Sequence, residues 1–227
     1  NQYSSHEKWS NSEGIFMSFS RNEIDTMSGT RKRTYQLLVT TALQLFEQGM
    51  LPTVSELAAH AGVSRATAYR YFPTQSDLIS ATVDASLAPI IAWQPTPEDN
   101  TQQRITALLN LAYPQMFKHE GALRGALQVS LQQWAKERQS SEYTEKRFIR
   151  GHRKEILLKV IEPLKAHYPQ EMWDKVIKAF SLIYGSEVFL VMKDIWKMDD
   201  QQVIDMTQWM AKAILNQAKS DFPIDND

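Results

Sequence analysis

The clearest pattern of hydrophobic and polar positions lies within residues 53–72, where two short amphipathic helices meet at a glycine. The first has apolar residues at the spacing of one helical face, namely Val54, Leu57, Ala58 and Ala61. Gly62 is expected to end this helix, because the residue after a helix often adopts a left-handed backbone that glycine reaches at little cost. Ser64 is then a good N-cap for a second helix, in which Ala68 and Phe72 face inward.

The second helix leaves short, hydroxylated or cationic side chains on its outer face: Arg65, Ala66, Thr67, Tyr69 and Arg70. Such residues suit a helix that lies against nucleic acid, because hydroxyls and guanidinium groups donate to phosphates and base edges. Two helices around a glycine-containing turn are typical of a helix-turn-helix, whose second helix enters the major groove. An ordinary helical hairpin with a polar surface is the alternative, since the bare pattern is only moderately specific.

Helical periodicity continues along the rest of the chain. A first helix is predicted over 31–48, and a fourth follows over 76–93, where Pro89 is expected to kink or end it. A proline-rich loop at 94–100 comes next. The further predicted helices cover 101–118, 121–138, 142–167, 170–197 and 199–219. Because no useful stretch alternates with the period of a strand, the sequence predicts an all-α fold.

Residues 31–80 closely resemble the N-terminal domain of the tetracycline-repressor (TetR) family of bacterial transcription regulators. The resemblance is carried by Ala42-Leu43-Gln44-Leu45-Phe46 with Gly49, by the helix-turn-helix, and by Tyr69-Arg70-Tyr71-Phe72-Pro73 followed by Ser76-Asp77-Leu78. It implies a three-helix DNA-binding domain followed by a C-terminal helical bundle for ligand binding and dimerisation. The expected divisions are a flexible leader at 1–29, the DNA-binding domain at 30–80 and the ligand-binding and dimerisation domain at 81–227.

The resemblance also implies which residues contact DNA. It assigns to the phosphate backbone Thr53, Ser64, Thr67, Tyr69 and Gln75. It assigns to base edges or the groove Arg65, Ala66, Arg70 and Tyr71. Arg65 is the best candidate for bidentate reading of a guanine. The family often has a lysine where this chain has Gln75, so one charge-assisted phosphate contact lacks its usual residue.

Charge and composition limit the alternatives. The net charge of the 227 residues is −1, whereas residues 31–80 hold five Lys or Arg against three acidic residues, so any phosphate binding must be local. The triplet Arg31-Lys32-Arg33 is either a solubilising charge run or a further phosphate contact. The absence of cysteine excludes disulfides and thiol nucleophiles and fits a cytoplasmic protein. No apolar run is long enough for a transmembrane helix, and no signal peptide is recognisable.

Catalytic motifs are missing from the sequence. It contains no nucleophile elbow, no phosphate-binding or dinucleotide-binding glycine loop and no zinc-protease motif. The five histidines are scattered, with none at ligand spacing to another. We therefore expect neither an enzyme nor a cofactor or metal ion.

The resemblance implies a small-molecule pocket in the C-terminal part. The candidate ligand-binding residues are Tyr113, Phe117, Trp134, Arg150, Tyr184 and Glu187, although aromatic residues of this kind also suit an ordinary core. Glu187 lies in an apolar run and needs a partner if it is buried, which the arginines of 147–153 offer. A structural ion pair and a ligand-binding pair both stay open.

Taken together, patterns and resemblance predict a homodimeric repressor that binds a palindromic operator in double-stranded DNA and is released by a small-molecule effector. The helices at 170–197 and 199–219 look like the pair that forms a four-helix bundle with a second subunit in this family. One alternative is an activator, or a ligand-independent regulator controlled by a protein partner. Two others are an interaction module whose helix-turn-helix no longer binds DNA and a helical enzyme.

Overall fold

The computed structural model describes residues 27–139 and 152–223. Within these ranges the chain forms helices and no β-strand, which confirms the predicted all-α class. The first helices are α2 (Gly29–Glu47), α3 (Val54–His60), α4 (Arg65–Tyr71), α5 (Gln75–Ser86) and α6 (Ala88–Ile91). The later ones are α7 (Thr101–Lys118), α8 (Glu120–Gln139), α9 (His152–Lys165), α10 (Gln170–Ile183), α11 (Glu187–Phe189), the π-helical segment η1 (Leu190–Ile195) and α12 (Asp200–Asp221). Nearly all of the predicted leader lies outside the described residues.

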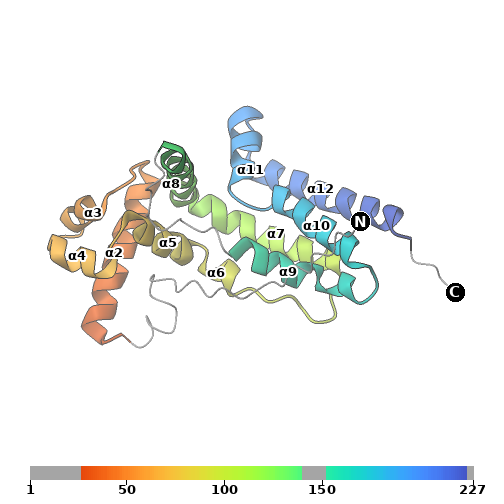
Figure 1. The fold of residues 1–227 in the computed structure, drawn as a ribbon, viewed down its shortest axis with the longest axis horizontal. Helices are drawn as coiled ribbons and strands as arrows, with labels where there is room; N and C mark the ends of the chain where they lie inside the picture. The colour runs from red at the N-terminus through yellow and green to blue at the C-terminus, as the bar shows by residue number, and fades with distance from the viewer. Residues whose placement is uncertain (1–26, 140–151, 224–227) are drawn as a thin grey trace, which may run out of the picture.

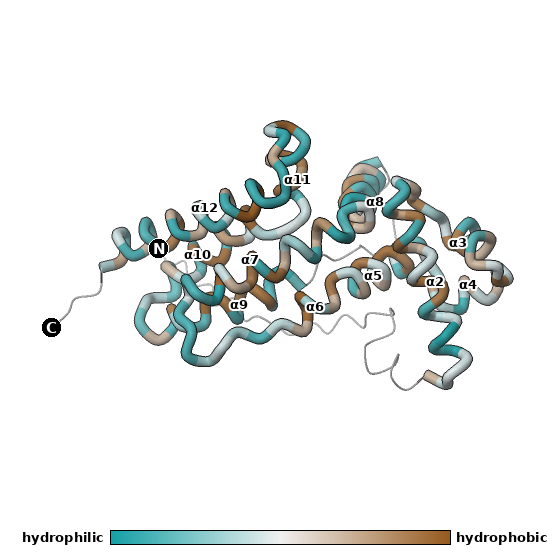
Figure 2. The backbone as a smooth tube through the Cα atoms, turned by 180° about the vertical axis from the view of Figure 1, so that it is seen from behind, coloured by the Kyte–Doolittle hydropathy of each residue, from teal (hydrophilic) through white to brown (hydrophobic). Residues whose placement is uncertain are grey.

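The molecule is elongated, with α2, α3 and α4 at one end and α9, α10 and α12 at the other (Figure 1). We call α2 to α5 the head and α7, α9, α10 and α12 the body. Hydrophobic and hydrophilic residues alternate along the helices (Figure 2), as expected for helices that bury one face. None of the helices in the described ranges is long and apolar enough to cross a membrane.

Two separate hydrophobic cores stabilise these ends. The head core combines buried residues of α2 to α5, among them Leu38, Leu57 and Phe72, and it also includes residues of α8. The body core is built from α7, α9, α10 and α12 around Tyr113 and Phe180. The contribution of α8 to the head core was not apparent from the sequence, which placed all of 81–227 in one unit.

The loop at 94–100 is tied to the body by one buried arginine. The guanidinium of Arg104 donates to the carbonyls of Pro97 at 3.0 Å, Asp99 at 2.9 Å and Lys159 at 2.9 Å. A buried guanidinium needs such acceptors, because an unpaired buried charge would be costly. Arg104 therefore fixes the loop between head and body against α7 and α9.

The helix predicted over 170–197 is interrupted. It ends at Ile183, where Tyr184 is extended (φ −129°, ψ 108°) and Gly185 has φ +139°, and the chain then continues as α11 and η1. A φ of this sign favours glycine, so Gly185 permits the break. Likewise the helix predicted over 76–93 ends at Ser86, and Pro89 lies in the first turn of the short α6, where proline is tolerated.

Candidate DNA-binding site

The turn between α3 and α4 has the geometry that its glycine predicted. Gly62 adopts φ +67°, and the N–H of Val63 donates to the carbonyl of Ala58 at 3.0 Å. This is the bond of a Schellman motif, which satisfies a carbonyl at the end of α3. The turn therefore fixes the direction in which α4 leaves α3.

Side-chain caps define where the two helices begin. The Thr53 hydroxyl accepts from the N–H of Glu56 at 3.2 Å, and the Glu56 carboxylate accepts from the N–H of Thr53 at 2.8 Å, which completes a capping box. Ser64 caps α4 as predicted, accepting from the N–H of Thr67 at 3.1 Å. Thr53 and Ser64 remain exposed, so their caps leave them accessible at the surface.

The outer face of α4 is open to solvent. Arg65, Ala66 and Arg70 are exposed, and within the described residues neither arginine forms a hydrogen bond or ion pair. On the opposite side, Ala68 and Phe72 are buried in the head core, as the helical spacing predicted. The helix thus presents two arginines without a partner among the described residues, while its inner face is anchored.

Tyr69 is exposed and bridges the two helices. Its hydroxyl lies 3.2 Å from the hydroxyl of Ser55, with either group able to donate. The ring is 45% exposed. This contact orients the Tyr69 hydroxyl at the surface shared by α3 and α4, which suits a phosphate contact.

Tyr71 does not occupy the groove position that was expected of it. It is only 7% exposed, its ring centroid lies 6.3 Å from that of Tyr35, and its hydroxyl donates to the carbonyl of Arg31 at 3.1 Å. The reason is helical spacing: Tyr71 lies three residues after the buried Ala68 and shares its inward face. This spacing was visible in the sequence.

Gln75 opens α5 with its side chain turned toward the chain itself. Its amide donates to the carbonyl of Pro52 at 3.2 Å, which joins the start of α5 to the link between α2 and α3. Lys136 of α8, which the sequence analysis did not single out, lines a cavity of about 100 Å³ together with Thr74, Gln75 and Ser76. A cation is thus present near the position where the expected lysine is missing.

Of the candidate ligand residues, three lie in or against the body core. Tyr113 is fully buried and its hydroxyl donates to the carbonyl of Ile183 at 2.6 Å, while the Phe117 ring centroid lies 5.6 Å from that of Tyr113. Tyr184 is also buried. Burial raises the pKa of both tyrosine hydroxyls above the ordinary value, so both stay protonated.

The remaining candidates are dispersed. Glu187 forms an ion pair with Arg153, whose guanidinium also donates to the carbonyl of Ser181 at 3.2 Å. Arg150 lies outside the described residues. Trp134 is 52% exposed on α8, outside the core around Tyr113, and the guanidinium of Arg138 lies 4.0 Å from its ring centroid. The structure therefore does not bring Trp134 into one site with the other candidates.

Known sequences are similar to this chain in the head. The family of bacterial regulatory proteins described as the tetR family matches residues 38–82. Nucleoid occlusion factor SlmA of Mannheimia succiniciproducens is 32% identical over 106 residues, 45% of this chain and 49% of that protein. The HTH-type transcriptional repressor LfrR of Mycolicibacterium smegmatis is 33% identical over 84 residues, 34% and 44% of the two chains. The chain spans about half the length of the curated relatives it matches.

Solved structures extend the similarity to the whole fold. A tetR-family transcriptional regulator from Streptomyces coelicolor superposes with a TM-score of 0.60 at 15% identity, covering 84% of this chain and 83% of that one. A TetR transcriptional regulator from Rhodococcus sp. RHA1 gives a TM-score of 0.53 at 14% identity, covering 81% and 96%. At such identities the similarity concerns the arrangement of the helices.

Proposed function

Because the chain belongs to the TetR family of bacterial regulatory proteins, we propose that it is a homodimeric transcriptional repressor. It binds a palindromic operator and is released from it by a small-molecule ligand. The observation that carries the proposal is the outer face of α4, where Arg65, Tyr69 and Arg70 are exposed and neither arginine has a partner among residues 27–139 and 152–223. A bacterial regulator that reads chromosomal DNA acts in the cytoplasm, the compartment that the sequence also favours.

The proposed roles follow from the geometry of the head. Arg65 and Arg70 reach base edges in the major groove, and the small side chain of Ala66 allows the helix to approach. Thr67 and Tyr69 donate to phosphates on either side, and these contacts set position and salt dependence. The Thr53 hydroxyl donates to the Glu56 carboxylate at 2.9 Å and the Ser64 hydroxyl lies 2.8 Å from that of Thr67, so Thr53 and Ser64 donate to phosphate only after releasing these partners. Gln75 contributes to the phosphate contact only after releasing Pro52. Tyr71 is left out of this set, because it is buried.

Dimerisation is supported by a second apolar stripe on α12. The buried stripe that joins the body core is Val203, Thr207, Ala211, Leu215 and Ala218. The stripe at Met206, Met210 and Ala213 lies on another side of the helix and is half-buried or exposed. Trp209, about 180° around the helix from the buried stripe, is 67% exposed, and Leu182 of α10 is 80% exposed. A second copy would cover these side chains and hold two heads at half-sites about one helical turn (~34 Å) apart.

Release from the operator by a ligand is proposed on two grounds. It rests on the family and on the aromatic residues Tyr113, Phe117 and Tyr184 in or against the body core. Ligand binding beside these aromatic residues would shift the heads and lower operator affinity.

The test is selection from a random-sequence duplex pool at two salt concentrations, followed by sequencing. The full chain is compared with Arg65→Ala and Tyr69→Phe, and with Lys178→Ala on α10 as a control away from the head. We expect an enriched inverted repeat and binding that weakens steeply with salt. Arg65→Ala should relax one base position by about 1–3 kcal/mol, whereas Tyr69→Phe should weaken all sequences alike.

Two results would contradict parts of the proposal. Absent or salt-insensitive binding, with no sequence enriched, would mean that the head does not read DNA, and a protein partner would then be sought. An enriched single half-site, without its inverted copy, would contradict the dimer while leaving the head intact. Release is tested separately, by a thermal-shift screen of amphipathic ligands followed by operator binding in the presence of each hit.

A further inference from the structure

Helix α8 belongs to both cores of the molecule. Ala122, Ala126 and Val129 are buried in the head core. Leu123, the residue between the first two, is buried in the body core. Figure 1 shows α8 between the head and the C-terminal helices. A single rigid helix therefore contacts both ends of the molecule, and a displacement of α8 relative to one core must disturb its contact with the other.

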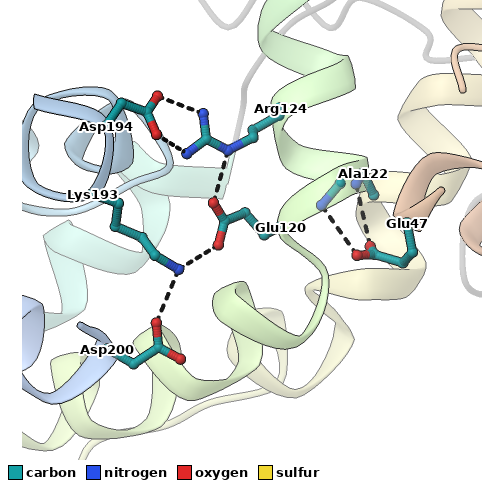
Figure 3. A network of polar contacts seen from close by, with 8 residues as sticks. Glu47, Glu120, Ala122, Arg124, Lys193, Asp194 and Asp200 are labelled. Carbon is teal, nitrogen blue, oxygen red and sulfur yellow. Dashed lines mark hydrogen bonds and ion pairs between the residues drawn. The ribbon is translucent and has the colours of Figure 1, made fainter. Parts of the chain in front are cut away.

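The first turn of α8 is attached to the end of α2. The carboxylate of Glu47 accepts hydrogen bonds from the N–H groups of Gly121 at 3.3 Å and Ala122 at 3.4 Å (Figure 3). These N–H groups have no partner inside their own helix, so Glu47 acts as a cap supplied by the head. A Cβ on Gly121 would overlap the carbonyl of Phe46, and one on Gly125 would lie 2.6 Å from the Phe46 ring. The backbone of α8 thus packs directly against the backbone of α2 at Gly121 and against the Phe46 ring at Gly125.

The opposite side of the same turn is attached to η1. Arg124 donates to both carboxylate oxygens of Asp194, at 2.8 Å and 2.7 Å, and to Glu120 at 2.8 Å. Lys193 contacts Glu120 at 2.5 Å and Asp200, at the start of α12, at 2.9 Å. Figure 3 shows these five charged residues as one continuous chain of alternating sign. We call them the α8–η1 cluster.

Apart from this cluster, η1 is held by Met192, which packs against the body core. None of its residues is buried, and Val191 and Ile195 expose apolar side chains to solvent. Together with α11 it lies between Gly185 at φ +139° and Lys197 at φ +56°, and Lys193 additionally lies 4.7 Å from the centroid of the Phe117 ring. A π-helix is a rare form that competes with the ordinary α-helix. Conversion would change the register by one residue, a rotation of about 100°, and would withdraw Lys193 and Asp194 from their partners.

From these contacts we propose that η1 is a conformational switch whose position is transmitted by the α8–η1 cluster to α8, and by Glu47 to the end of α2. When η1 is π-helical, the cluster is formed and holds α8 against the head. When η1 changes its register, or a bound molecule displaces it, the cluster opens and the head loses that constraint. The consequence for operator affinity rests on the proposed function; the coupling between η1 and the head does not.

Amide hydrogen exchange of the full chain, followed by mass spectrometry, measures this coupling without DNA. Asp194→Asn removes the charge and one of the two oxygens that accept from Arg124, and Glu47→Gln weakens the cap at the other end. The control is Asp174→Asn, which removes the acid of the exposed Lys178–Asp174 pair on α10. We expect Asp194→Asn to accelerate exchange about fivefold or more at η1, at residues 121–122 and at the end of α2. Because coupling is reciprocal, Glu47→Gln should accelerate exchange at η1.

Acceleration confined to η1 in Asp194→Asn, or an unchanged η1 in Glu47→Gln, would overturn the proposal. Asp194→Glu retains the charge and should restore slow exchange at the end of α2, which separates loss of the cluster from general unfolding. With an operator in hand, Asp194→Asn should change its Kd by about threefold or more, while Asp174→Asn should not. If the protein binds no DNA, the exchange experiment still tests whether η1 is coupled to the head. If the protein binds DNA but exchange at the end of α2 is unchanged in Asp194→Asn, the switch is contradicted and the proposed function is not.

Discussion

The hydroxyl of Tyr71 donates a 3.1 Å hydrogen bond to the main-chain carbonyl of Arg31. This bond joins the last turn of α4 to the first turn of α2, forty residues earlier in the chain. It therefore places the basic triplet that starts at Arg31 beside the helix that carries Arg65 and Arg70. This contact brings the triplet at the beginning of α2 to the end of α4, the helix that we propose reads DNA.

Replacing Tyr71 by phenylalanine should test this arrangement. The ring remains and keeps its packing against Tyr35, but the carbonyl of Arg31 loses its donor. We expect the free energy of unfolding in urea to fall by about 1 kcal/mol. DNA affinity should also fall, and to a similar extent for all sequences, if the triplet contacts phosphates and is not only a solubilising charge run.

The matched control for this change is Tyr69→Phe, which removes an exposed hydroxyl from the same helix. Its unfolding free energy should change less than that of Tyr71→Phe, since Ser55 and Tyr69 are accessible to water. If Tyr71→Phe changes the preferred base at one position of the DNA sequence, Tyr71 contacts the groove, which would contradict its buried placement.

A second contact between head and body depends on pH. The ring nitrogen Nε2 of His152, at the start of α9, lies 2.9 Å from the carboxylate of Asp84 on α5, and Glu155 lies 4.0 Å from Nδ1. The hydrogen bond to Asp84 raises the pKa of His152 above its ordinary value of 6.5, against the opposing effect of burial. The charged histidine is thus favoured in the folded protein, so its stabilisation is complete below pH 6.5 and is lost as pH rises through the raised pKa.

The effect of removing this charge should therefore depend on pH. His152→Gln should lower the free energy of unfolding by about 0.5 kcal/mol at pH 6 and by less at pH 8. The estimate is small because the His152 and Asp84 side chains are 36% and 45% exposed. Urea unfolding of both proteins across this pH range measures the difference.

His119 provides a control of opposite sign. Burial lowers its pKa below 6.5, so its neutral form is favoured in the folded protein. Its contribution is complete above pH 6.5 and is lost as pH falls through the lowered pKa. His119→Gln should therefore cost more at pH 8 than at pH 5, and equal pH dependence in the two variants would refute both assignments.

The parts of the fold that the sequence predicted are those in which local signals act alone. Gly62 and Ser64 set the turn and the second helix of the helix-turn-helix, because a left-handed backbone and an N-cap are decided by neighbouring residues. The burial of Ala68 and Phe72 followed from helical spacing. The spacing of Tyr71 from Ala68 gave the same information, but the resemblance to a family outweighed it.

The parts that could not be predicted depend on contacts between distant segments. The apolar stripe continues through Val188, so periodicity hid the break that Gly185 makes in the helix predicted over 170–197. The sequence predicted a helix over 121–138 but did not assign it a partner, whereas in the structure the small residues Ala122 and Ala126 let α8 pack into the head core. The partner of Glu187 came from the predicted arginine-rich run, but only the fold could select Arg153.

The Arg153–Glu187 pair lends itself to a test of whether it is structural. Arg153 also donates to the carbonyl of Ser181, near the end of α10, and it lies so close to Gly185 that a Cβ there would overlap the guanidinium. These contacts hold the break after α10 in place. We expect Glu187→Gln to lower the free energy of unfolding by about 1 kcal/mol, because a charge-assisted bond is weakened.

The same variant should still release its operator at the effector concentration that releases the unaltered protein. A loss of release with unchanged stability would instead make Glu187 a ligand-binding residue. Lys178→Ala is again the comparison, since it removes a charge from α10 outside this pair.

The dimer face can be tested with one tryptophan. Trp209 is 67% exposed on the side of α12 that faces away from the body core, so a single chain gains little from it. If a second copy covers this face, Trp209→Glu places a charge in a desolvated contact and should cost about 2 kcal/mol or more of association energy. The dissociation constant of the dimer should then rise about 30-fold, as measured by sedimentation or light scattering over a range of concentrations.

The free energy of unfolding of the separated chain should change by less than about 0.5 kcal/mol, because the residue is exposed there. The control is Trp134→Glu, the same substitution at a half-exposed tryptophan of α8, which should leave association unchanged. If Trp134→Glu disrupts the dimer and Trp209→Glu does not, the subunits associate through α8 instead of α12.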